Sequence, residues 1–196
     1  MKACTYFSTF VAAAIFKVAF LKHFASLDAE TLSFVKTFVV GRLEDAAMVV
    51  ESLVIVSHLA KNVSESELLQ ICLGALLAVK RQRFGIEPRL SVFSFVNEQL
   101  KRLPPSKDLF DTFLNAVADE KDPRNLIQIF EIVPQLALTI QDESDLEELF
   151  ESISCYFPIT FRATPSDPRL VSVDSLKAAL ARALSCPSFA SEAMIF

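Results

Sequence analysis

The sequence contains few of the residues on which common catalytic and phosphate-binding sites depend. Among 196 residues there are no tryptophans, two tyrosines, two histidines and three glycines. So little glycine argues against Gly-rich phosphate loops and against sheet folds with many tight turns. Cys155 and His58 are candidates for a nucleophile–base pair, but no third group or sequence motif accompanies them. We therefore expect no enzymatic activity and no catalytic residue.

The cysteines are also sparse and widely spaced. Cys4, Cys72, Cys155 and Cys186 form no C-x-x-C pair and lie far apart in the sequence. A secreted disulfide scaffold has denser cysteines, so the pattern favours a reducing compartment. The spacing also fits no zinc or iron–sulfur site, and we predict no bound metal or cofactor. We expect these cysteines, including Cys155 at a predicted helix end, to be buried as small apolar side chains.

The charges do not favour a nucleic-acid-binding protein. The formal net charge is −5, with a net basic stretch at residues 80–102 and a net acidic stretch at 119–151. We interpret these stretches as solvated helix faces, with a bipolar surface that steers partners as the alternative. The basic turn at 80–89 has no aromatic platform beyond Phe84, so we expect no direct nucleic-acid binding. The acidic stretch groups its carboxylates on one helix surface rather than around a substrate.

The first 27 residues have an uncertain status. Residues 3–16 carry no charge and follow Lys2, a pattern that a targeting segment shares. The uncharged run is shorter than the roughly 18 to 20 residues that span a bilayer. Lys17, Lys22 and His23 continue it as a plausible helix. We predict an N-terminal helix over 1–27, either a repeat helix or a cap, with a targeting segment as the alternative, and expect no membrane association.

Apolar residues recur at the helical spacing through most of the chain. The sequence is 52% hydrophobic with a mean hydropathy of +0.40, so a large part of it must be buried. Stripes at three- and four-residue spacing predict successive amphipathic helices. One predicted stripe consists of Leu69, Cys72, Leu73, Leu76 and Leu77.

Helix starts and interruptions can be placed from the sequence. Ser64 with Glu67 and Ser144 with Glu147 match capping boxes. The other predicted caps are Ser106, Asp122 with Pro123 at the first helical position, and Ser172 or Asp174. Pro134 lies inside a predicted helix and should kink it. Three prolines between 156 and 172 predict an ordered loop there.

These elements group into units of repeat length. Segments 28–62, 63–103, 104–141 and 142–187 each hold two predicted helices joined by short links. Their lengths match HEAT-type repeats, in which helix pairs stack on one another. The predicted fold is therefore all-α: a HEAT-type α-solenoid of antiparallel helix pairs over 28–196. Its apolar end at Phe196 suggests a truncated fragment.

Two motifs carry a family resemblance. Glu-Lys-Asp-Pro-Arg-Asn-Leu at 120–126 is followed by Ser-Cys-Tyr-Phe-Pro-Ile at 154–159, and then by Phe161 and Asp167-Pro168. Together with a looser Arg-Leu-x-Asp turn at 42–45, they resemble the N-terminal domain of the MMS-nineteen nucleotide excision repair protein family. The motif residues are Asp122, Pro123, Arg124, Asn125, Cys155, Tyr156, Phe157, Pro158, Phe161, Asp167 and Pro168.

The resemblance implies an adaptor function. That family is the HEAT-repeat subunit of the cytosolic iron–sulfur protein assembly targeting complex. The implied partners are the targeting subunits and iron–sulfur client proteins such as DNA helicases and polymerases. The implied localisation is cytoplasm and nucleus, in support of DNA repair and transcription. Two alternatives stay open: a generic HEAT-type solenoid such as a nuclear-transport receptor, and a membrane-associated helical protein.

Arg124 is the one motif residue whose position conflicts with local electrostatics. A cation in the first turn of a helix is disfavoured by the helix dipole. We therefore expect Arg124 to be held by Asp119, Glu120 or Asp122, or by the loop at 156–161. Our hypothesis is that Arg124 and Asn125 join this turn to that loop and so have a structural role.

Overall fold

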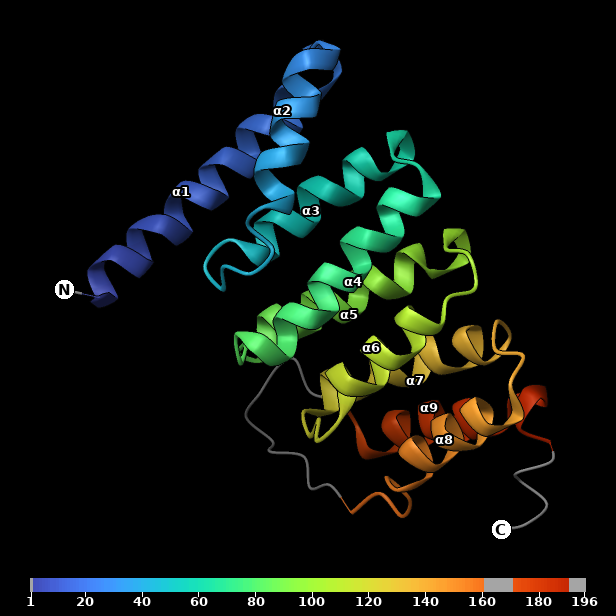
Figure 1. Ribbon diagram of the computed structural model, residues 1–196. Helices are drawn as coiled ribbons and strands as arrows, with labels where there is room; N and C mark the ends of the chain where they lie inside the picture. Colours follow the sequence, from blue (N-terminus) through green and yellow to red (C-terminus); the bar gives the residue numbers. More distant parts are fainter. Residues whose placement is uncertain (1, 161–170, 191–196) are drawn as a thin grey trace. The chain divides into compact units, whose positions relative to one another are not determined.

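The structure is a computed structural model that describes residues 2–160 and 171–190, with side chains from residue 9 onward. Within this part of the chain every regular element is a helix, which confirms the predicted all-α class (Figure 1). The chain divides into two compact units, Met1–Phe95 and Val96–Phe196. The two units are described separately below.

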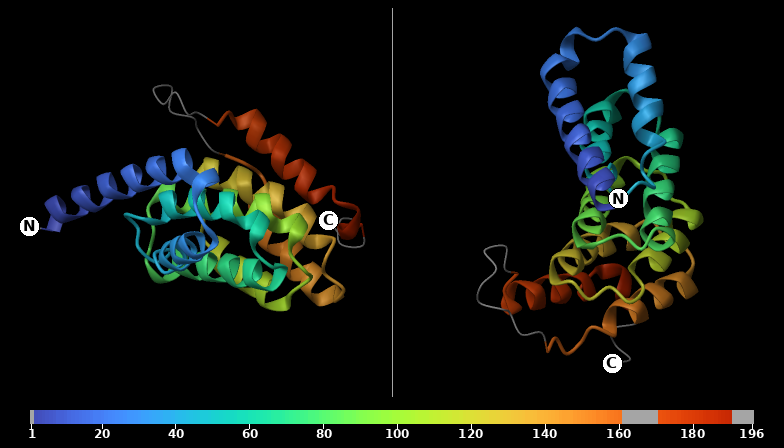
Figure 2. Two further views of the ribbon diagram at one scale, coloured as in Figure 1. Left: turned by 90° about the horizontal axis from the view of Figure 1, so that it is seen from above. Right: turned by 90° about the vertical axis from the view of Figure 1, so that its left-hand side faces the viewer.

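The first unit begins with three helices that pack together. They are α1 (Lys2–His23), α2 (Ala29–Val40) and α3 (Val49–Leu59), and both α1 and α2 contact α3. Figure 2 shows α1 and α2 as neighbouring helices that run in opposite directions, because the chain reverses between them. Asp28 begins α2 because its carboxylate accepts a hydrogen bond from the Thr31 amide at 2.7 Å. Short 3₁₀ turns follow α1 at Phe24–Ser26 and α3 at Ala60–Asn62.

An ion pair joins α1 to α3. Lys17 Nζ lies 2.5 Å from Glu51 Oε2, and the Glu51 side chain is nearly buried. Ala13 and Phe20 on α1 are also buried. Helix α1 is therefore packed into the first unit through both apolar and charged contacts.

The first unit also contains α4 (Glu65–Arg81) and most of α5 (Ile86–Gln99). Ser64 caps α4 by accepting from the Glu67 amide at 3.3 Å, as predicted. The buried positions of α4 differ in part from the predicted stripe: Leu68, Ile71 and Ala75 are buried, whereas Leu77 is exposed. Helix α5 begins at Ile86, so Pro88 lies in its first turn, where the missing amide has no helical partner.

The second unit is built around α7. It contains the end of α5, a 3₁₀ turn at Leu100–Arg102, α6 (Lys107–Val117), α7 (Pro123–Ala137), α8 (Glu143–Ser154), α9 (Val173–Leu184) and a 3₁₀ turn at Pro187–Phe189. Helix α7 contacts α8, α9 and both 3₁₀ turns. Buried aromatic rings fill the space between them, and Phe150 meets Phe189 edge-on at 5.5 Å.

The predicted helix starts of this unit are mostly confirmed. Ser106 accepts from the Leu109 amide, Asp122 caps α7 with Pro123 in its first turn, and Ser172 caps α9. The predicted capping box of Ser144 and Glu147 is wrong. Asp142 caps α8 instead, accepting from both the amide and the hydroxyl of Ser144, so the helix begins at Glu143.

Each of the four segments predicted as helix pairs holds two helices: α2 with α3, α4 with α5, α6 with α7, and α8 with α9. Helix α7 is continuous through Pro134, and the kink there stays a prediction. Most of the loop predicted at 156–172 lies outside the described residues. Within the described part, the window Thr9–Ser26 is by length and composition apolar enough to cross a membrane.

Candidate functional site

The first motif forms a tight turn around a buried carboxylate. Glu120 is 6% exposed, and its Oε1 accepts hydrogen bonds from the amides of Lys121 and Asp122, both at 2.9 Å. Its Oε2 accepts from Asn125 Nδ2 at 2.9 Å. Asp119, just before it, has a φ of 67°, in the left-handed region that Asp tolerates better than most residues. The Glu120 carboxylate thus accepts hydrogen bonds from the amides at the start of α7.

Asp122 and Arg124 complete this turn. Asp122 Oδ1 accepts from the Arg124 amide at 3.0 Å, and the guanidinium of Arg124 forks onto both oxygens at 3.0 and 3.2 Å. Burial alone would raise the pKa of Asp122, but the hydrogen bonds and charge of Arg124 outweigh it and hold the pKa below its usual value. The cation that the helix dipole disfavours is therefore compensated by the cap residue itself. Asp122 was one of the three acids expected to hold Arg124.

Tyr156 links the two motifs. Its hydroxyl donates to the backbone carbonyl of Glu120 at 3.0 Å, and its ring meets Phe130 edge-on at 5.7 Å. Burial, followed by the nearby negative charges, raises the pKa of Tyr156 to about 12, so the hydroxyl stays protonated as a donor. The two motifs meet as expected, and the contact that joins them runs from Tyr156 to Glu120. The hypothesis had placed this contact on Arg124 and Asn125.

The remaining motif residues have different surroundings. Cys155 is exposed, so its predicted burial is wrong: it follows the last residue of α8, and its Sγ donates to the Ser152 carbonyl at 3.1 Å. Phe157 is 73% exposed and is joined to Pro158 by a cis peptide bond. Three residues, Phe161, Asp167 and Pro168, lie outside the described residues.

The chemistry of this cluster is structural. Most of its polar groups bond to one another and to helix ends. Asn125 is fully buried, and its Nδ2 is paired with Glu120 while its Oδ1 has no partner among the described residues. No group of three metal-ligating side chains occurs in the part of the chain with described side chains. The sequence motifs thus mark a junction that fixes the start of α7 against the end of α8.

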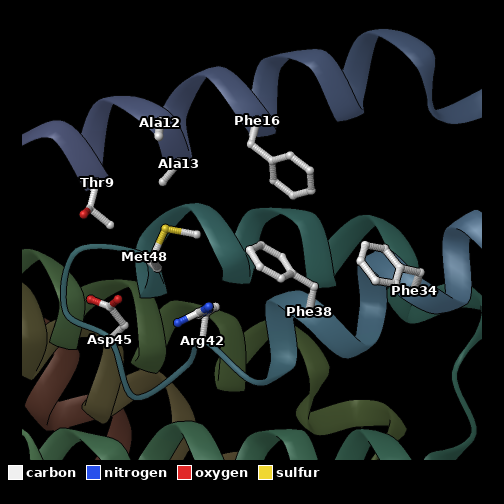
Figure 3. A pocket seen from close by; sticks show the side chains of 9 residues that line it. All are labelled: Thr9, Ala12, Ala13, Phe16, Phe34, Phe38, Arg42, Asp45 and Met48. Atoms are coloured by element: carbon white, nitrogen blue, oxygen red, sulfur yellow. The ribbon is translucent and has the colours of Figure 1, made fainter.

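A second feature, which the sequence did not predict, is an apolar groove in the first unit. It lies between α1, α2 and the link that follows α2, and has a volume of about 600 Å³ (Figure 3). Phe16, Phe38 and Met48 line it, and Phe34 at its edge is 71% exposed. Val35 and Val39 form the buried side of α2, and Phe34 lies off that side. A large apolar residue outside the helical spacing of the core was the available signal. A smaller groove of about 570 Å³ lies between Phe157, Pro158 and α9 in the second unit.

Fold and site together define a helical-repeat protein, in which the motifs join the ends of two helices and the grooves are apolar. A family model described as "Dos2-interacting transcription regulator of RNA-Pol-II", MMS19_N, matches residues 9–196. The chain therefore belongs to the MMS19 N-terminal family, which confirms the resemblance seen in the motifs.

Relatives from distant organisms agree. The chain is 35% identical over 179 residues to the MMS19 DNA repair/transcription protein of Saccharomyces cerevisiae, covering 82% of this chain and 17% of that protein. It is 42% identical over 98 residues to the human MMS19 nucleotide excision repair protein homolog, covering 47% of this chain and 9% of that protein. The chain spans less than a fifth of these relatives. No solved structure matches it.

Proposed function

We propose that this chain is a non-enzymatic adaptor domain that binds recipient proteins for cytosolic iron–sulfur cluster insertion, and so supports DNA repair and transcription. The observation that carries the proposal is the family match over residues 9–196. The yeast relative is itself named a DNA repair/transcription protein. The proposed partners are assembly targeting subunits and iron–sulfur clients such as DNA helicases and polymerases, in cytoplasm and nucleus.

The structure supports a binding role through its surface. Apolar side chains of large size stand exposed on α1 and α2, among them Phe10, Ile15 and Phe34. Exposed apolar surface of this kind marks sites of protein or membrane association. The buried motif residues of α7 hold their helix ends in place, as a rigid platform requires.

Affinity purification with mass spectrometry tests the proposal. The baits are this chain and a version extended with the remaining repeats of a longer relative. Enrichment of targeting subunits and iron–sulfur proteins with the extended bait is the expected result. Recovery of a nuclear-transport GTPase in their place would instead support the transport-receptor alternative, and recovery of neither group would defeat the proposal.

The apolar window Thr9–Ser26 favours a second candidate, a membrane-associated helical protein. Against it stand the ion pair of Lys17 with Glu51 and the burial of Phe20, which use α1 for packing within the unit. We therefore prefer the adaptor. Carbonate extraction of a tagged chain separates the two candidates: the adaptor should appear in the supernatant, and retention in the membrane pellet would favour the second.

A further inference from the structure

The groove of the first unit combines an apolar lining with a cation, Arg42, that has no carboxylate partner among the residues the structure describes. On the α1 side, Ala12 and Ala13 leave room because their side chains are small, while Phe16 stands beside them (Figure 3). On the α2 side, Phe38 meets Phe16 edge-on at 5.6 Å. Two alanines on α1 and the aromatic rings of Phe16, Phe34 and Phe38 therefore line an open apolar slot that suits bulky apolar side chains.

Arg42 lies at one end of this slot. Its guanidinium carbon is 5.3 Å from the centre of the Phe38 ring, a cation–π contact that holds the side chain over the groove. Among the described residues, no carboxylate lies within ion-pairing distance of Arg42. The guanidinium thus keeps its planar set of donors for a ligand carboxylate.

The turn that carries Arg42 is fixed in place. Leu43 is buried, and Asp45 Oδ1 accepts from the Ala47 amide at 2.9 Å. The carbonyl of Asp45 accepts from the amides of Met48 and Val49. This is the Arg-Leu-x-Asp turn of the sequence, and its packing holds Arg42 at the rim of the groove without using the guanidinium.

The groove is long enough along α1 to accommodate about two turns of a helix. Its lining on α1 runs from Thr9 to Phe16, about 10 Å along the helix axis. An amphipathic helix that presents apolar residues at i, i+3, i+4 and i+7 covers the same length. The carboxylate of Asp45, which also lines the groove, disfavours a polyanion such as nucleic acid or an anionic lipid surface. A partner with a single carboxylate near Arg42 fits better.

We propose that this groove binds an amphipathic segment of a partner protein, whose apolar side chains contact Phe34 and Phe38 and whose carboxylate pairs with Arg42. The inference rests on the proposed function only in that both treat the chain as protein-binding. If no peptide binds in the assay below, the proposed function still stands on the recovery of targeting subunits. If targeting subunits are not recovered, the groove can still bind the peptides. The two results are therefore distinguishable.

The test is a fluorescence-anisotropy titration of the full chain with three synthetic peptides. They share an apolar face of Leu at i, i+3, i+4 and i+7, and carry Glu, Gln or Lys at the positions flanking that face. The Glu peptide should bind tightest and the Lys peptide weakest, with about two- to fivefold between neighbours in the series. Arg42→Gln should abolish the advantage of the Glu peptide, and Arg42→Glu should make the Lys peptide bind tightest.

The apolar contribution is tested with a matched pair of variants. Phe34→Ser should weaken all three peptides by at least about tenfold, because an aromatic contact is lost. Ile15→Ser is the control: Ile15 is 65% exposed on α1 but does not line the groove, so binding should be unchanged. Circular dichroism checks that each variant keeps its helix content.

Four results would overturn the proposal. The first is that none of the peptides binds, and the second is that Arg42→Glu leaves the peptide order unchanged. The third is that vesicles of phosphatidylcholine and phosphatidylserine displace the Glu peptide, which would assign the groove to a lipid surface. The fourth is dimerisation in sedimentation velocity that Phe34→Ser abolishes, which would assign it to a second copy of the chain.

Discussion

Glu120 is the residue through which the two sequence motifs meet. A buried carboxylate is stable when its oxygens accept several hydrogen bonds, and Glu120 accepts from two amides and from Asn125. Its carbonyl also receives the hydroxyl of Tyr156. The acid in this turn therefore organises the start of α7 and attaches the end of α8 to it.

The Tyr156 hydroxyl can be removed without changing the shape of the ring. Tyr156→Phe should lower the free energy of unfolding by about 1 kcal/mol, because the Glu120 carbonyl loses its partner while the contact with Phe130 is kept. Urea unfolding followed by circular dichroism measures the change. An unchanged midpoint would mean that solvent replaces the hydroxyl at no cost.

Arg124→Ala removes the cation that pairs with the cap residue. We expect a loss of about 1–2 kcal/mol, since both partners are mostly shielded from solvent, with helix content unchanged. Arg182→Ala is the control, because Arg182 is exposed in the last turn of α9, and it should change stability by less than about 0.5 kcal/mol. Thermal unfolding measures both variants. Equal changes in melting temperature would show that the ion pair of Arg124 with Asp122 does not stabilise the fold.

For single residues, the sequence predicted local roles such as helix caps better than it predicted contacts between distant residues. Asp122 as cap and Pro123 in the first turn follow from local rules and are confirmed. The Tyr156–Glu120 bond joins residues 36 apart in sequence, and no local rule relates them. The exposure of Cys155 was missed for a similar reason, because it depends on what packs over the end of α8.

At the scale of elements, the ion pair of Lys17 with Glu51 joins α1 to α3. Lys17→Met should destabilise the first unit by about 1–3 kcal/mol, because it leaves the Glu51 carboxylate nearly buried without its cation. Lys22→Met removes the same charge from an exposed position of the same helix and should have little effect. The double change Lys17→Met with Glu51→Met should recover most of the loss. If Lys17→Met and Lys22→Met unfold alike, the pair is not a structural contact.

Carboxylate caps make helix starts sensitive to acid. The Thr31 amide and hydroxyl lower the pKa of Asp28, and the hydroxyl and amide of Ser144 lower the pKa of Asp142. Their pKa values are thus lower in the folded than in the unfolded chain, so protons bind the unfolded chain first. Their stabilisation is present above about pH 4 and is lost as the pH falls through the folded values.

Replacing both caps tests this pH dependence. Asn at Asp28 and Asp142 keeps an acceptor oxygen but does not titrate. Asp28→Asn with Asp142→Asn should therefore flatten the decline of unfolding free energy between about pH 5 and pH 2, measured by urea unfolding at each pH. A decline as steep as in the unmodified chain would place the acid sensitivity at other groups.

Helices were predictable as elements because their signals are local. Caps and apolar spacing placed two helices in each predicted pair. The predicted stripe of α4 was partly wrong because Leu, Ile and Ala occur all round that helix, so Leu68 and Leu77 cannot be ranked without their neighbours. The groove could not be predicted for the same reason. Its prediction requires the distance between α1 and α2, which their sequences do not give.

For the whole molecule, family membership and surface chemistry support the same role. The match from residue 9 onward includes most of α1. The exposed aromatic ring of Phe34 and the guanidinium of Arg42 give that region the features of a binding surface. The proposed role of holding other proteins can be tested by exchange, because the chain is 35% identical to the yeast relative.

The most direct test of this claim is a chimaera of the yeast relative in which the aligned segment is replaced by this chain. Quantitative affinity purification compares it with the same protein lacking the segment. The adaptor account predicts that the chimaera recovers iron–sulfur recipient proteins at the level of the unmodified relative, whereas the deletion recovers fewer. Equal recovery by the chimaera and the deletion would contradict it, because the segment would then contribute nothing to holding recipients.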